Sequence, residues 1–121
     1  MSRPWLRVVI LGLAGAAHAG GAEPVQTRCG WWDNPSPGNA WLIDRDGAWE
    51  VAIQGGHQAE GDWPEIPARQ KVRVNGSYGY GCACLQVRVN PQTRQVSAIL
   101  IAKAQPLAQC RSDKALGKPP G

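Results

Sequence analysis

The sequence predicts a small, mostly β domain that forms an antiparallel sheet, a sandwich or a partly closed barrel and is stapled by disulfides. Short segments of alternating apolar and polar residues recur along the chain, with turn-forming residues between them. No long amphipathic helical pattern is present. Four cysteines, Cys29, Cys82, Cys84 and Cys110, follow a segment typical of an export signal.

Residues 1–19 are expected to be a cleavable signal peptide. Arg3 and Arg7 form a positively charged region that precedes an apolar segment of ten residues, and Ala17 and Ala19 fit the small-x-small cleavage rule. As a helix, ten residues would span about 15 Å, roughly half of a bilayer core, so a membrane anchor is not expected. We therefore expect cleavage near Ala19, a periplasmic or secreted location, and a mature chain that does not span a membrane.

The mature chain is expected to be one domain. We divide it into a flexible lead over residues 20–27, a disulfide-bonded β domain over residues 28–116 and a frayed tail over residues 117–121. A chain of this size buries under about 70% of its unfolded surface, so its core is modest and disulfides add useful stability.

In the first half, residues 28–40 are expected to form a turn-rich loop, because Pro35 and Pro37 fix the backbone there. Residues 41–44 and 49–53 are expected to be strands. The Asp46-Gly47 pair between them is a strong hairpin signal.

In the second half, residues 54–69 are expected to be irregular. Residues 82–89 alternate, with Ala83, Leu85, Val87 and Val89 on one face. The expected elements are strands 71–74, 82–89 and 95–104, the last containing the densest apolar run (98–102), and helical turns 106–110 and 112–116, the second capped by Ser112.

The four cysteines allow three disulfide pairings. Cys82 and Cys84 lie two residues apart in a strand, so each is expected to reach a distant partner. We expect strands 82–89 and 95–104 to pair as a hairpin, which places Cys110 near Cys82, so we favour Cys29–Cys84 with Cys82–Cys110. The swapped pairing is nearly as well supported. Zinc or redox chemistry at these cysteines is disfavoured, and no metal or cofactor is expected.

Aromatic and polar residues in two segments form the candidate binding surface. Trp41 and Trp49 are expected to lie in the core. Adjacent Trp31 and Trp32 point in opposite directions in an extended chain, so one of them is expected to be exposed. The proposed binding residues are Trp31, Trp32, Asn34, Asn39, Ser77, Tyr78 and Tyr80.

Charge is distributed unevenly along the mature chain. Residues 20–65 hold eight acids and two bases, whereas residues 66–121 hold nine bases and one acid. Either the strands of the two halves pair and neutralise each other, or a basic face meets an acidic partner or an anionic polymer. Nucleic acid is not an expected partner of an exported domain with so small a net charge.

Several motifs resemble those of a family of small exported bacterial proteins classified only as a domain of unknown function. They include Arg28-Cys29-Gly30-Trp31 and the Asn-Gly-Ser-Tyr-Gly-Tyr-Gly-Cys-Ala-Cys string of residues 75–84. The resemblance covers roughly residues 28–113 and implies export, a bacterial source and a single domain. It implies no activity and no catalytic residues.

The function expected from these observations is an exported, non-catalytic binding module for an envelope or secreted protein, such as a hydrolase that it inhibits. One alternative is binding to cell-wall glycan, including peptidoglycan, through exposed aromatic rings. Another is a small enzyme centred on His57, the only histidine of the mature chain. Catalytic motifs that would support an enzyme are absent, so no enzyme is expected.

Overall fold

The computed structural model describes residues 23–121, and the predicted signal peptide lies outside them. The domain is mostly β, as predicted. Its elements are β1 (Gln26–Ser36), β2 (Asn39–Asp44), β3 (Gly47–Ala52), the 3₁₀ helix η2 (Ala68–Gln70), β4 (Val72–Asn75), β5 (Tyr78–Asn90), β6 (Gln95–Gln105) and the short helix α2 (Leu107–Arg111).

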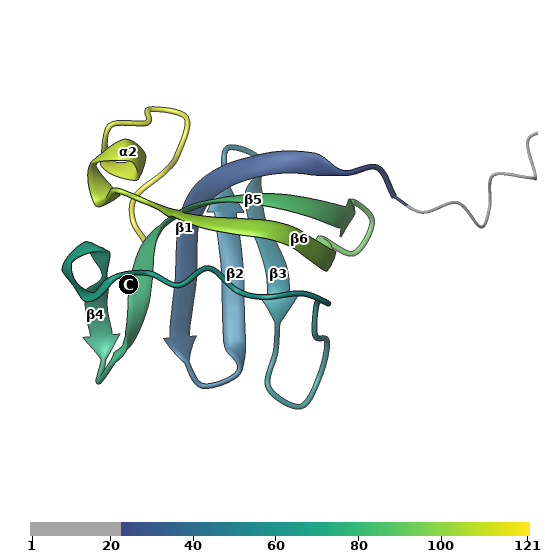
Figure 1. The fold of residues 1–121 in the computed structure, drawn as a ribbon, viewed down its shortest axis with the longest axis horizontal. Helices are drawn as coiled ribbons and strands as arrows, with labels where there is room; N and C mark the ends of the chain where they lie inside the picture. Colours follow the sequence, from purple (N-terminus) through teal and green to yellow (C-terminus); the bar gives the residue numbers. More distant parts are fainter. Residues whose placement is uncertain (1–22) are drawn as a thin grey trace, which may run out of the picture.

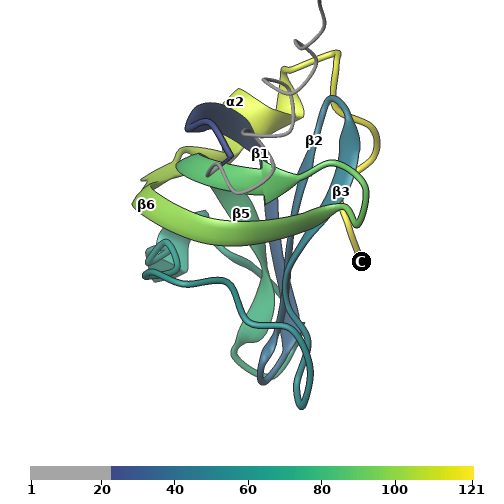
Figure 2. The same ribbon diagram turned by 90° about the vertical axis from the view of Figure 1, so that its right-hand side faces the viewer.

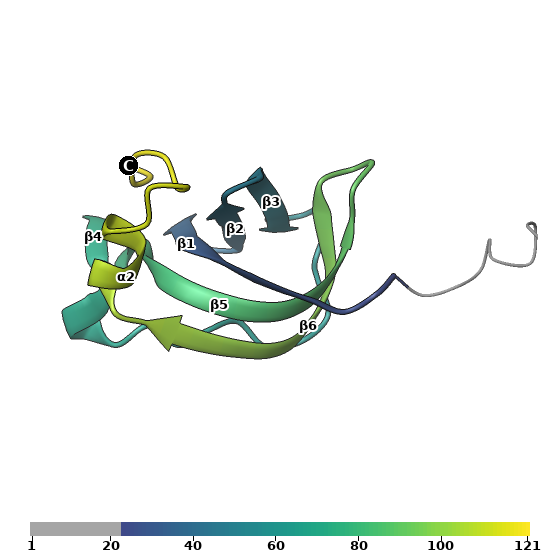
Figure 3. The ribbon, with the colours of Figure 1, turned by 90° about the horizontal axis from the view of Figure 1, so that it is seen from above.

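The strands form a ring in the order β1-β2-β3-β6-β5, which closes because β5 also pairs with β1 (Figures 1 and 3). All of these pairings are antiparallel except the contact between β3 and β6. Three hairpin-connected strands with a fourth lying beside the first make a Greek key. Of the three predicted architectures, the partly closed barrel is the one that the strand pairing shows. A five-stranded, partly open Greek-key barrel is also the plan of the OB-fold, and such plans host many unrelated functions.

The barrel closes between β3 and β6 mainly through an inserted segment. The two strands share one register pair, Glu50 with Gln95. Beside it, the segment of residues 58–66, here called the strap, begins between them. The Ala59 N–H donates to Val51 O at 2.9 Å, and the Ile99 N–H donates to Glu60 O at 2.7 Å. The strap then crosses the front of the molecule below β6 (Figure 1).

The core follows the alternation predicted for residues 82–89. Ala83, Leu85, Val87 and Val89 are all buried inside the barrel. Their partners come from every side of the ring: Trp32, Ala40, Leu42, Trp49, Val51, Ala52, Val96 and Ile99. The hairpin predicted at Asp46-Gly47 joins β2 and β3, and Gly47 has the positive φ of 106° that this turn requires.

A second cluster packs the C-terminal segment against the outside of the barrel. Leu107, Cys110 and Leu116 cover Trp31 and Cys82 there. Figure 2 shows this segment on the side of β2 and β3, away from the strap. Gly121, which belongs to the segment expected to be a frayed tail, lies beside Tyr80.

Both favoured disulfides are confirmed. Cys29 is bonded to Cys84 across β1 and β5, where the two residues are register partners with Cα atoms 4.0 Å apart. Cys82 is bonded to Cys110 of α2, with Cα atoms 5.8 Å apart. These two bonds use all four cysteines, so no free thiol is left.

Several local predictions were wrong. Trp41, expected in the core, is only half-buried and belongs to neither core cluster. Residues 28–40 are not a loop, because β1 runs from Gln26 to Ser36 and is paired on both edges, with β2 and β5. Pro35 is tolerated because it lies where the strand ends. Ser112 does not cap a second helical turn; its N–H closes α2 on Ala108 O at 2.9 Å. The turn that follows is organised by the Asp113 carboxylate, which accepts from the Ala115 N–H.

Removing either disulfide should destabilise the domain, and the two losses should be distinguishable. The closed loops span 28 residues for Cys82–Cys110 and 55 for Cys29–Cys84, so the loop-entropy model gives about 3.5 and about 4 kcal/mol. We expect Cys82→Ala/Cys110→Ala also to red-shift tryptophan emission, because it releases the segment that covers Trp31. Urea unfolding of both double variants measures the losses; unchanged midpoints would contradict the prediction.

Candidate functional site

Neither Trp31 nor Trp32 is exposed, so the expectation that one of the rings faces solvent was wrong. Trp31 is 1% exposed and packs edge-on against Tyr80, with ring centroids 5.4 Å apart. Trp32 is 3% exposed and packs inside the barrel against Trp63. The rings do point in opposite directions, but the C-terminal segment covers the outer one. Neither ring can stack on a ligand in this structure.

Asn34 and Asn39 stabilise the turn between β1 and β2. The Asn34 side chain donates to Ser36 O at 2.9 Å and to Asn39 O at 2.8 Å. The Asn39 amide donates to Ser36 Oγ and accepts from the Gln54 N–H. Their hydrogen-bonding groups are therefore used within the fold.

Ser77, Tyr78 and Tyr80 lie next to the turn between β1 and β2, as a shared surface would require. Tyr80 is the register partner of Asp33, and the Asn75 side chain donates to Pro35 O at 3.3 Å. Ser77 is exposed and both tyrosines are half-buried. The structure thus brings the two predicted segments together, without the exposed tryptophan ring.

His57 is engaged with the backbone. Its Nε2 atom lies 2.8 Å from Val96 O, which ties the loop after β3 to β6. Within residues 23–121 no group of three or more His, Cys, Asp or Glu side chains could hold a metal ion. The helices of this region are too short to cross a membrane.

A charged cluster that sequence analysis missed lies at the hairpin between β2 and β3. The Arg28 guanidinium donates to Asp44 Oδ2 at 2.7 Å and to Asp46 Oδ2 at 2.9 Å. Asp44, only 6% exposed, also accepts from the Trp49 indole N–H and the Asp46 N–H. Burial opposes the charged form of Arg28, but the two aspartates outweigh it and raise its pKa.

The Trp49 ring in this cluster lies between two guanidinium groups. Arg28 lies 4.3 Å and Arg94 3.9 Å from its ring centroid. Arg94 also donates to Asp46 O, which joins the turn after β5 to the hairpin. Arg28, Arg94, Asp44 and the Trp49 indole are all engaged within the fold, so we assign the cluster to stability.

Asp33 is a half-buried carboxylate on the outside of the barrel. It lies in one cross-strand row between Trp41 and Tyr80. Burial raises its pKa above the ordinary value of 3.8.

A groove of about 530 Å³ lies between the strap and β6. A second hollow, of about 620 Å³, lies beside the Arg28 cluster. The groove forms because the strap is bonded to β6 only as far as Ile99 and then diverges from it. Gly61 marks the divergence with a φ of 100°, and a side chain there would collide with Ile99 O. The groove is lined by Gly61, Asp62, Trp63 and Glu65 of the strap and by Ile99, Leu100, Ala102 and Ala104 of β6.

The β6 side of this groove is an open strand edge. Within residues 23–121, strand pairing of residues 100–105 is found only with β5. Leu100 is the extra residue of a β-bulge, since Ile99 and Ile101 oppose the consecutive residues Val87 and Gln86. Leu100 is 46% exposed and Ile101 is 44% exposed.

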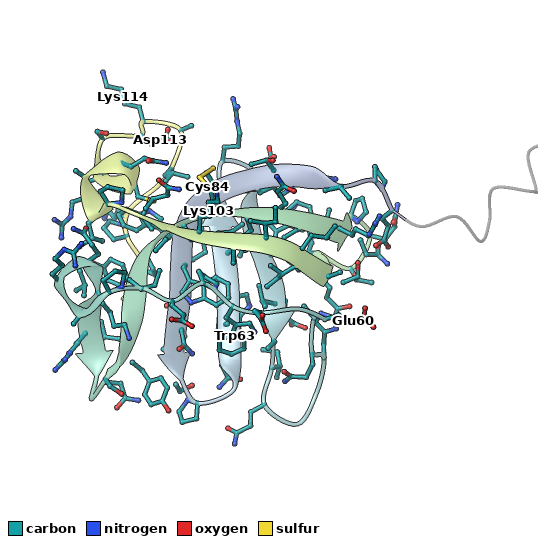
Figure 4. All side chains as sticks on the ribbon, viewed as in Figure 1. Glu60, Trp63, Cys84, Lys103, Asp113 and Lys114 are labelled. Carbon is teal, nitrogen blue, oxygen red and sulfur yellow. A yellow bond between two sulfur atoms is a disulfide. The ribbon has the colours of Figure 1, made fainter. Side chains whose placement is uncertain are left out.

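The charges of the groove are all negative. Asp62 and Glu65 are exposed on the strap wall, and Glu60 stands at the end where the strap begins (Figure 4). No lysine or arginine lines the groove. Lys103 is the register partner of Cys84 and lines a different hollow, together with Cys84 and Ile101. Within residues 23–121 the only ion pairs are those of Arg28, so these carboxylates have no ion-pair partner there.

The sequence did carry a signal for this edge. Residues 98–102 are five consecutive apolar residues in a strand, and successive side chains of a strand face opposite sides. Such a run must either be buried on both faces or expose part of itself. In this small barrel the second outcome holds, at Leu100 and Ile101.

Comparisons with known proteins give one match. The profile of a family described as "protein of unknown function (DUF4087)" matches residues 23–117. Among curated proteins and solved structures, none matches the chain.

Asp44→Ala should destabilise the domain by about 3–5 kcal/mol, because it leaves Arg28 partly buried without its main partner. The matched control is Asp46→Ala, whose side chain is 55% exposed and should cost less than about 1 kcal/mol. Urea unfolding followed by tryptophan fluorescence compares the two. Equal losses would contradict the assignment of Asp44 as the central acceptor.

Asp33→Asn should stabilise the domain at neutral pH. Because its pKa is raised on folding, the native state binds the Asp33 proton more tightly than the unfolded chain does. The favourable contribution is present below pH 3.8 and is lost as pH rises through the raised value. The melting temperatures of wild type and variant should therefore separate as pH increases. A constant difference, or one shared by the exposed control Asp113→Asn, would disprove this.

Proposed function

The chain belongs to the DUF4087 family of proteins of unknown function, and we propose that it is an exported, non-catalytic module that binds a protein partner along the open edge of β6. The observation that supports this most is the combination of an unpaired strand edge with exposed Leu100 and Ile101. Natural sheets protect such edges by pairing, covering or charging them. An edge that stays open and carries exposed Leu100 and Ile101, with Lys103 as its charged residue, fits a site that another chain covers.

The construction of the edge suits binding. β6 is held along its other side by β5, and the Cys29–Cys84 bond joins β5 to β1. A preformed, rigid edge loses little conformational entropy when a partner docks. Trp63 stands on the facing wall and is itself held by Trp32. A held aromatic ring beside an apolar strand is a common anchor of protein interfaces.

Export and a bacterial envelope setting belong to the same proposal. Two disulfides fit an oxidising compartment, and the pattern of residues 1–19 fits a signal peptide. In that setting the partner would be an envelope or secreted protein, with an inhibited hydrolase as one case. The glycan alternative relied on exposed aromatic rings and the basic C-terminal half; the fold buries Trp31 and Trp32 and leaves Tyr78 and Tyr80 half-buried. No observation favours the alternative centred on His57.

The proposal is tested by cross-linking from the edge inside the cells that make the protein. The full chain carries a photo-reactive amino acid at Leu100 or at Val74, which is 49% exposed on β4 and lies away from the groove. The protein captured from position 100 is identified, purified and titrated against wild type, Leu100→Glu and Val74→Glu. We expect Leu100→Glu to weaken binding about tenfold or more and Val74→Glu to leave it unchanged. Equal capture from both positions, or equal affinities, would overturn the proposal.

A further inference from the structure

We infer that the groove accepts an extended, positively charged peptide segment, which adds a strand to residues 100–104 of β6 while its lysine or arginine side chains meet the carboxylates of the strap. This inference rests on the proposed function and specifies the chemistry of the partner. Strand addition to an exposed sheet edge is a recurrent mode of peptide recognition, in which backbone pairing gives affinity and pockets for alternate side chains give specificity.

The available edge has the length of a short strand. Residues 100–104 extend over about 16 Å at the usual rise per residue. Their pairing with β5 occupies one side of the strand and leaves the side toward the strap open. Ala102 and Ala104 form the β6 side of the groove, and their small side chains leave room above the strand. An incoming backbone can therefore approach β6 closely.

The chemistry of the walls selects the side chains of the segment. Asp62 and Glu65 line the groove, Glu60 lies at its end, and none of them has an ion-pair partner within residues 23–121. Lysine or arginine at alternate positions would meet these carboxylates. The positions between them would face Trp63 and the alanines, which suits valine-sized apolar side chains. An acidic segment would meet only like charges.

The same charges argue against a second copy of this chain in the groove. Two copies that paired through their β6 edges would bring two acidic straps together. The strap of each copy would also project toward the incoming strand, since it lies along the same edge. Like charges placed together at an interface reduce affinity.

The probe is an acetylated, amidated peptide of alternating lysine and valine, titrated against the purified, oxidised protein. Binding should protect those amides of residues 100–104 that point away from β5 in hydrogen exchange. It should also weaken when salt rises from about 0.05 to about 0.5 M. A peptide with glutamate in place of lysine should not bind. Two further peptides are N-methylated at every second backbone nitrogen, one at the odd positions and one at the even positions. The peptide whose methyl groups block the N–H groups that face β6 should lose binding, and the other should keep it. This difference separates strand pairing from simple charge attraction.

Matched variants locate the charges that matter. Asp62→Asn/Glu65→Gln should weaken the lysine–valine peptide about fivefold, whereas Asp113→Asn, a change of an exposed acid near α2 (Figure 4), should not. Equal effects of these variants, equal binding of both N-methylated peptides, or equal binding of the glutamate peptide would each overturn the inference. So would a dimer that forms through β6 and is broken by Leu100→Glu in sedimentation.

These outcomes separate the two proposals. If Leu100→Glu releases the cellular partner but the lysine–valine peptide does not bind, the edge is a protein-binding site and the inferred chemistry is wrong. If the peptide binds as described but nothing in the cell is captured from position 100, the groove has the inferred specificity and the proposed function is wrong.

Discussion

Closure of the barrel between β3 and β6 is the constraint on which the rest of the structure depends. These strands meet at a single register pair, and the hydrogen bonds of Ala59, Glu60 and Ile99 complete the ring. The same bonds hold the start of the strap against β6, and Gly61 marks the residue at which the strap diverges from β6. The edge of β6 is therefore bonded to the strap at one end and, within residues 23–121, left unpaired at the other. The groove is a direct result of how this barrel closes.

The parts of the fold that sequence predicted well depend on local patterns. The alternation of residues 82–89, the Asp46-Gly47 hairpin and the strand at 95–104 each follow from a few neighbouring residues. The pairing of strands 82–89 and 95–104 favoured the observed disulfides, because it places Cys110 near Cys82, but it left the swapped pairing nearly as well supported. β1 was missed because pairing on both its edges outweighs the turn-forming tendency of Pro35 and Pro37. The strap was missed because its bonds join segments far apart in sequence.

The candidate site was harder to predict because exposure is a property of the whole fold. Trp31 is buried only because the segment after β6 returns over it, about eighty residues later in the chain. Charge is organised in a similar way. The acidic and basic halves pair as strands through β1 and β5, yet within residues 23–121 no ion pair joins them. The acids of the strap and the bases beyond residue 66 therefore stay available to solvent and to other molecules.

The positions of Cys82 and Cys84 on one strand have a further consequence for the integrity of the chain. One bond spans residues 29–84 and the other spans residues 82–110, so the two closed loops overlap. A single cut of the backbone anywhere from residue 29 to residue 110 thus leaves both pieces covalently joined. A molecule cut once by a protease would therefore still hold its strands together.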